Sequence, residues 1–111
     1  AYFDGSADEA APALEALGAD AVGVNCASGP EMLENVVRRM KNACGLPIIA
    51  KPNAGLPTIS EQGEAVYSLT PDAFAAAMLP LADAGASILG GCCGTTPEHI
   101  AALRAALDAR A

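Results

Sequence analysis

The sequence predicts an α/β fold in which short parallel strands alternate with helices. Helix-like periodicity marks four segments, at about residues 7–17, 30–43, 71–84 and 97–109. Short apolar runs lie between them and are expected as strands, at about residues 20–25, 46–51 and 86–90. Regular alternation of these two kinds of segment is typical of a parallel sheet covered by helices.

The starts of the three later helices carry the clearest local signals. Each of these helices is expected to begin at a proline, namely Pro30, Pro71 or Pro97, and an acidic residue follows each proline. Proline has the helical φ already fixed at the first position, and an acidic side chain favours the positive end of the helix. Thr70 and Thr96 precede two of the prolines and are the predicted N-caps.

The passages from helix to strand repeat a glycine signal. Gly18, Gly45 and Gly85 each follow a predicted helix, where a residue with positive φ commonly closes the last turn. "LGADAVGVN" and "AGASILGG" resemble two copies of one helix-to-strand passage. The strands themselves are short and apolar, which is typical of strands buried on both faces.

The segment 54–69, "AGLPTISEQGEAVYSL", interrupts this rhythm and is predicted as a long loop of the kind that often forms lids or binding loops. Because it follows a strand, it should lie on the same side as the other strand-to-helix loops. Three parallel strands leave a sheet edge and part of the core uncovered, so the chain is either a small open sheet or a piece of a larger barrel. A helix precedes the first strand, which favours the barrel piece.

Composition restricts the classes of partner. The chain has 111 residues, 52% of them hydrophobic, which is enough for one packed domain. Its formal net charge of −7 argues against a nucleic-acid or anionic-membrane surface, because both require basic clusters. No apolar run approaches the roughly 20 residues of a membrane helix. The first residues lack the features of a signal peptide, so we expect reduced thiols in the cytoplasm.

Three cysteines are placed where a parallel sheet keeps its functional groups. Cys26 ends the first predicted strand, and Cys92 and Cys93 follow the last one within "GGCCGTTPEHI". The carboxyl ends of parallel strands share one face, so the three sulfurs could converge and bind zinc with a fourth position open. Adjacent residues of a regular strand point to opposite sides. Cys92 and Cys93 can therefore face one metal only if the strand ends and turns there, which their glycine neighbours permit. Buried packing and a disulfide or redox role remain the alternatives.

Other polar residues have weaker signals. Cys44, at a helix end, is interpreted as structural, and His99 as a solvated residue in the first turn of the last helix. Asn53 in "KPNAGLP" is either a turn residue or a weak oxygen ligand in the fourth zinc position. Lys51 either steers an anionic group or is an exposed charge at a strand end.

"GVNCASGP", "KPNAGLP" and "GGCCGTTPEHI", in this order and spacing, resemble the homocysteine S-methyltransferase domain, and most closely the homocysteine-binding module of cobalamin-dependent methionine synthase. The resemblance implies a zinc (β/α)8 (TIM) barrel, of which residues 1–111 form a single partial domain, its C-terminal portion. It also implies that Cys26, Cys92 and Cys93 hold the zinc, with Asn53 as the fourth partner before substrate binds.

The implied reaction is methyl transfer to the thiol of homocysteine, giving methionine, with a zinc-bound thiolate as the nucleophile. The implied partners are homocysteine, a methyl donor or cobalamin-carrying domain, and the N-terminal half of the barrel; neither nucleic acid nor a membrane is expected. Among the donors that serve such relatives, the loop sequences favour cobalamin. The alternative is a non-catalytic fragment in which Cys44 or His99 closes a structural zinc site.

Overall fold

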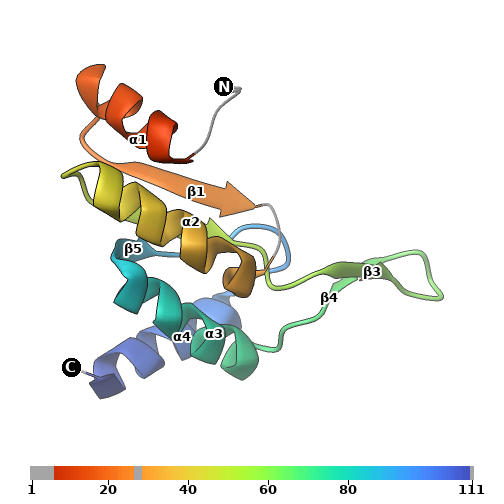
Figure 1. Ribbon diagram of the computed structural model, residues 1–111. Coiled ribbons are helices and arrows are strands. Elements are labelled where there is room, and N and C mark those ends of the chain that lie inside the picture. Colours follow the sequence, from red (N-terminus) through yellow and green to blue (C-terminus); the bar gives the residue numbers. More distant parts are fainter. Residues whose placement is uncertain (1–6, 27–28, 111) are drawn as a thin grey trace.

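The computed structural model describes residues 7–26 and 29–110, and it describes Cys26 through its backbone (Figure 1). Helices and strands alternate along most of the chain, as predicted. The elements are α1 (Ala7–Ala16), β1 (Val22–Cys26), α2 (Pro30–Ala43), β2 (Ile48–Pro52), β3 (Pro57–Ile59), β4 (Ala65–Tyr67), α3 (Pro71–Ala84), β5 (Ala86–Leu89) and α4 (Pro97–Arg110).

The predicted helix starts are confirmed. Helices α2, α3 and α4 begin at Pro30, Pro71 and Pro97. The hydroxyl of Thr70 caps α3 by accepting a hydrogen bond from the backbone N–H of Ala73 at 3.3 Å. Each start therefore follows from a local rule, since a proline at the first helical position needs no distant contact to favour the first turn.

The glycine signal after the helices is correct at two of three places. Gly18 and Gly85 have φ angles of 95° and 122°, in the region that glycine adopts readily. The prediction is wrong for Gly45, which is not among the glycines with positive φ. Helix α2 instead ends at Cys44 in an extended conformation, with φ −146°, and the N–H of Cys44 still reaches the carbonyl of Met40.

The parallel sheet has the strand order β1-β2-β5. Helices α1 and α2 pack on β1, α2 also contacts β2, α3 contacts β5, and α4 packs against α3. The strands contribute Val22, Ile48 and Ala50 to the core beneath these helices. The largest helical contributions come from fully or almost fully buried side chains: Leu33, Val37, Met40, Phe74, Met78, Leu81 and Leu103.

The opposite face of the sheet is uncovered. Ile49 is half-buried, Lys51 is exposed, and Ile88 is 50% exposed. The expectation that the strands are buried on both faces is therefore wrong for the described residues, because their helices cover one face. The expectation that three parallel strands leave part of the core open is confirmed.

The predicted loop 54–69 contains a β-hairpin that the sequence prediction missed. Strands β3 and β4 pair antiparallel, with Thr58 opposite Val66, and the hairpin projects away from the helices (Figure 1). Its turn includes Gly63, with φ 82°, whose N–H donates to the carbonyl of Ser60 at 2.9 Å. The strands have only three residues each and remain largely exposed, so they are too short to give a clear strand pattern in the sequence.

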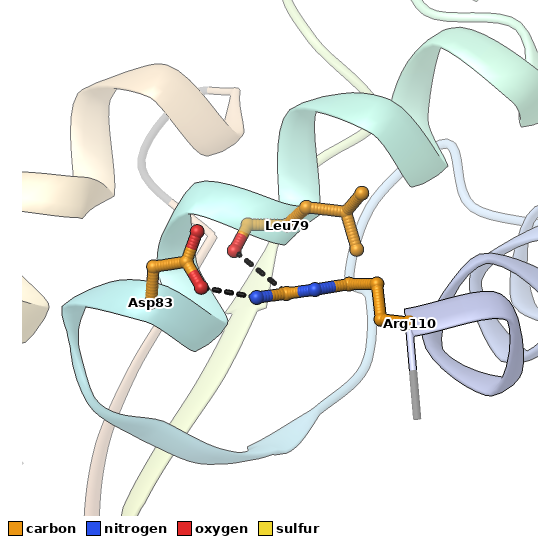
Figure 2. A network of polar contacts seen from close by, with 3 residues as sticks. All are labelled: Leu79, Asp83 and Arg110. Carbon is orange, nitrogen blue, oxygen red and sulfur yellow. Dashed lines mark hydrogen bonds and ion pairs between the residues drawn. The ribbon is translucent and has the colours of Figure 1, made fainter.

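The C-terminal helix is tied to its neighbour by a polar contact. Arg110, in the last turn of α4, forms an ion pair with Asp83 and donates a hydrogen bond to the carbonyl of Leu79 at 3.4 Å (Figure 2). Both partners lie near the end of α3, so the contact fixes α4 alongside it. None of the helices within residues 7–26 and 29–110 combines the length and apolar character that crossing a membrane requires.

Candidate metal centre

The carboxyl ends of the three parallel strands meet at Pro52. Cys26, the last residue of β1, is the register partner of Pro52 at the end of β2. On the other side, the carbonyl of Pro52 accepts a hydrogen bond from the backbone N–H of Cys92 at 3.0 Å. The backbones of Cys26 and Cys92 therefore flank the same residue from opposite sides. The side chain of Cys26 lies outside the described part of the structure.

The chain turns sharply at the paired cysteines. The carbonyl of Cys92 accepts hydrogen bonds from the N–H of Thr95 at 3.2 Å and from its hydroxyl at 2.7 Å. The Sγ atoms of Cys92 and Cys93 are 4.0 Å apart, so the two adjacent side chains face the same region. Two sulfurs bound to a tetrahedral zinc at about 2.3 Å each would lie about 3.8 Å apart. The observed spacing therefore fits a shared zinc ion.

Two glycines make this turn possible. Gly94 has φ 81°, and a methyl group added there would overlap the ring of Tyr67, which ends the hairpin strand β4. A methyl group on Gly91 would overlap the side chain of Thr95. The predicted need for glycine around the cysteine pair is thus explained by one positive φ angle, which other residues rarely adopt, and by two close approaches.

Asn53 holds the backbone of the cysteine turn. Its side chain is buried, with 9% exposure, and its Oδ1 accepts a hydrogen bond from the N–H of Cys93 at 3.1 Å. The next residue, Ala54, donates its own N–H to the carbonyl of Cys93 at 3.0 Å. Both backbone groups of Cys93 are therefore fixed by the segment that follows β2, and Asn53 is more than a turn residue.

The prediction that His99 is a solvated surface residue is wrong. His99 is only 7% exposed, and its ring packs edge-on against Phe74 with the ring centroids 5.5 Å apart. Its Nε2–H donates to the carbonyl of Leu69 at 2.9 Å, and its Nδ1 accepts the N–H of Thr96 at 3.2 Å. Since both ring nitrogens have partners, this arrangement leaves neither of them for a metal.

His99 supports the cysteine turn through the backbone. The residue that it anchors, Leu69, donates its N–H to the carbonyl of Ala54 at 3.0 Å, and Ala54 in turn binds Cys93. The sequence did contain a signal for one contact of His99, the one with Thr96. His99 stands three residues after the N-cap Thr96, which is the spacing at which a side chain can return to the cap N–H.

Cys44, the other candidate for closing a structural zinc site, lies away from the cysteine turn. Cys44 precedes β2, whereas Asn53 follows it, so the two are separated by the strand, about 16 Å long for five residues. Among the side chains that the structure describes, which exclude that of Cys26, no three His, Cys, Asp or Glu residues are grouped to hold a metal.

The backbone N–H of Glu98 and the Thr96 hydroxyl lower the pKa of the exposed Glu98 carboxyl.

Replacing His99 by Leu is expected to lower the free energy of unfolding by about 2–3 kcal/mol, because the Leu69 carbonyl and the Thr96 N–H lose a buried partner. Chemical denaturation measures the change. His99→Gln is the matched control, since its side-chain oxygen can still reach the cap N–H and should restore part of the loss. A loss below about 0.5 kcal/mol for His99→Leu would contradict this role.

The sequence is similar to known proteins over most of its length. The family model for homocysteine S-methyltransferase matches residues 3–107. A methionine synthase of Mycobacterium leprae (strain TN) and one of Mycobacterium tuberculosis (strain ATCC 25618 / H37Rv) are each 44% identical over 96 residues, which cover 86% of this chain. Homocysteine S-methyltransferase 4 of Zea mays is 34% identical over 91 residues, or 79% of the chain.

These alignments cover a small part of each relative. The matched segment spans 8% of each mycobacterial protein and 26% of the maize protein. Within this chain, however, the family match includes every helix and strand as far as residue 107, and with them all the residues of the cysteine turn. The chain belongs to the homocysteine S-methyltransferase family.

Proposed function

We propose that this chain is the C-terminal part of a (β/α)8 barrel that transfers a methyl group to the thiol of homocysteine and gives methionine, with zinc held by Cys26, Cys92 and Cys93. The observation that carries the proposal is the 4.0 Å spacing of the Cys92 and Cys93 sulfurs, at the end of the sheet where the Cys26 backbone also lies. The parallel strands and the uncovered sheet face are compatible with three consecutive units of a barrel.

The donor set suits this chemistry. A bound zinc ion would act as a Lewis acid and lower the pKa of the homocysteine thiol, so that a thiolate exists at neutral pH, whereas a free cysteine thiol has a pKa of about 8.5. Three cysteine thiolates already outweigh the two charges of Zn²⁺, so the substrate sulfur remains electron-rich. The thiol proton would be released to solvent, and the sulfur would attack the methyl carbon. The new S–C bond would form as the bond from methyl to donor breaks, and the electron pair of the broken bond would stay on the donor.

Asn53 would have two tasks in this centre. Its Oδ1 already accepts the N–H of Cys93, and the second lone pair of an amide oxygen remains for the fourth metal position before substrate arrives. The thiol of homocysteine would displace this oxygen, because sulfur is the softer ligand and suits zinc among thiolates.

Replacing Asn53 by Ala is expected to weaken zinc binding about 10- to 100-fold, as is typical when a residue that orients a metal ligand is lost. The affinity is measured by competition with a chromophoric chelator. Thr58→Ala is the control, since Thr58 bonds to the Val66 carbonyl within the hairpin and should leave zinc affinity unchanged. An affinity for Asn53→Ala equal to that of the unaltered protein would exclude both tasks.

The methyl donor proposed here is a cobalamin-bound methyl group presented by a separate domain. The support is the likeness of the strand-end loops to the cobalamin-linked members of the family, and the two mycobacterial relatives carry the name methionine synthase. A donor of this kind leaves the homocysteine sulfur as the only nucleophile that this part of the protein must supply.

The function is tested with the full-length protein, zinc-loaded or stripped by a chelator, incubated with homocysteine and one of methylcobalamin, betaine or S-methylmethionine. Mass spectrometry should detect methionine with the zinc-loaded protein and methylcobalamin, and none after zinc removal. Methionine formation that persists without zinc would refute the proposed mechanism. Formation with a different donor would refute the donor assignment alone.

A further inference from the structure

Lys51 lies in the row of residues just before the candidate sulfur ligands. In the register of the sheet its partner on β1 is Asn25, which immediately precedes Cys26. On the other side lies Gly90, two residues before Cys92. The N–H of Gly90 donates to the carbonyl of Ala50 at 3.0 Å. Across the sheet, Lys51 is therefore flanked by the residue before Cys26 and by a residue two positions before Cys92.

The side chain of Lys51 lies beside Gly90 on the neighbouring strand. A methyl group on Gly90 would lie 3.4 Å from Cγ of Lys51 and 4.0 Å from both Cδ and Cε, so the aliphatic stem lies alongside this glycine. The stem occupies the uncovered face of the sheet, where Ile49 and Ile88 are also found. Within the described part of the chain, no carboxylate forms an ion pair with Lys51.

This placement demands an anionic partner if the barrel closes. The uncovered face would then become the barrel interior, and a lysine is almost never buried without a compensating negative charge. The sulfur centre supplies that charge. Three thiolates with Zn²⁺ carry a net charge of −1. A homocysteine thiolate changes the net charge to −2, which disfavours the approach of the substrate.

We propose that Lys51 is a positioning residue whose ammonium group offsets the negative charge of the sulfur centre and so favours binding of homocysteine as a thiolate. This inference rests on the proposed function. The ammonium makes no covalent contact with the reacting atoms. It acts through its positive charge, carried on a stem that lies beside Gly90.

The test uses full-length, zinc-loaded protein and measures Kd by calorimetry for two thiols. The first is homocysteine, and the second is 3-mercaptopropylamine, which has the same thiol and amine but no carboxylate. The variants are Lys51→Met, which keeps the stem and removes the charge, and Lys51→Arg, which keeps the charge. Arg104→Met is the matched control, since it removes one positive charge from an exposed pair with Asp108 on α4.

Lys51→Met should raise Kd for both thiols by the same factor, about fivefold to tenfold for a unit charge acting at medium range. Lys51→Arg should change Kd less than about twofold, and Arg104→Met should leave it unchanged. An unchanged Kd in Lys51→Met would overturn the inference. A loss confined to homocysteine would overturn it as well, because Lys51 would then bind the carboxylate. The unaltered protein is the reference for the function: if it holds zinc but binds neither thiol, the proposed function fails as well.

Discussion

Cys92→Ala and Cys93→Ala should each reduce zinc retention to the level of the chelator-stripped protein and abolish methionine formation. Each substitution leaves two thiolates, too few for the site of three protein ligands with an open fourth position that catalytic zinc requires. Zinc content after gel filtration, measured by atomic absorption, gives the result directly. The expected effect is the largest in the protein because the metal is lost altogether.

Cys44→Ala is the matched control for these substitutions. Cys44 caps α2 at the opposite end of β2 from Asn53, so its removal should leave one zinc per chain. Loss of zinc in Cys44→Ala, or one zinc per chain in both Cys92→Ala and Cys93→Ala, would show that the metal is held elsewhere.

Phe74→Ala should lower the free energy of unfolding by about 3–5 kcal/mol, since a fully buried aromatic ring is replaced by a cavity. The ring also packs edge-on against His99, which binds the Leu69 carbonyl. The loss should therefore loosen the backbone that leads through Ala54 to Cys93. Chemical denaturation gives the stability.

The matched variant Phe74→Leu refills most of the cavity and should cost less than half as much as Phe74→Ala. Zinc affinity should fall in Phe74→Ala and recover in Phe74→Leu. If stability falls as expected while zinc affinity stays the same in Phe74→Ala, the packing of His99 would not support the cysteine turn.

The helices could be predicted because their signals are local. Pro30, Pro71 and Pro97 mark the observed starts of α2, α3 and α4, and each depends on the residue at one position rather than on distant packing. The central strands were predicted within two residues from their short apolar runs, and Gly18 and Gly85, with positive φ, follow the helices that precede two of them. Local chemistry therefore defines most of the α/β alternation.

Features that depend on long-range contacts were predicted less well. The burial of His99 requires Leu69, thirty residues away, and the ring of Phe74, which no local pattern indicates. For His99, the tertiary partners rather than a local residue preference determine the burial of the ring. The hairpin is a local feature and was missed for a different reason: β3 and β4 have only three residues each and are largely exposed.

The candidate metal site is an intermediate case. The order of the strands placed Cys26, Asn53 and Cys92 at one end of the sheet, and the parallel register bears this out. The shared direction of the Cys92 and Cys93 sulfurs could not be derived from spacing, because adjacent strand residues normally diverge. It depends on the turn at Gly94, where a positive φ and the nearby Tyr67 ring leave room only for glycine.

The ligand set of the zinc in the full-length protein is the most direct test of the central claim, and zinc K-edge X-ray absorption measures it. Before substrate is added, the spectrum should show three sulfur neighbours at about 2.3 Å and one lighter atom. After homocysteine is added, it should show four sulfurs. Fewer than three sulfurs at the start, or a closed four-ligand set that homocysteine leaves unchanged, would contradict a zinc centre that binds the substrate thiol.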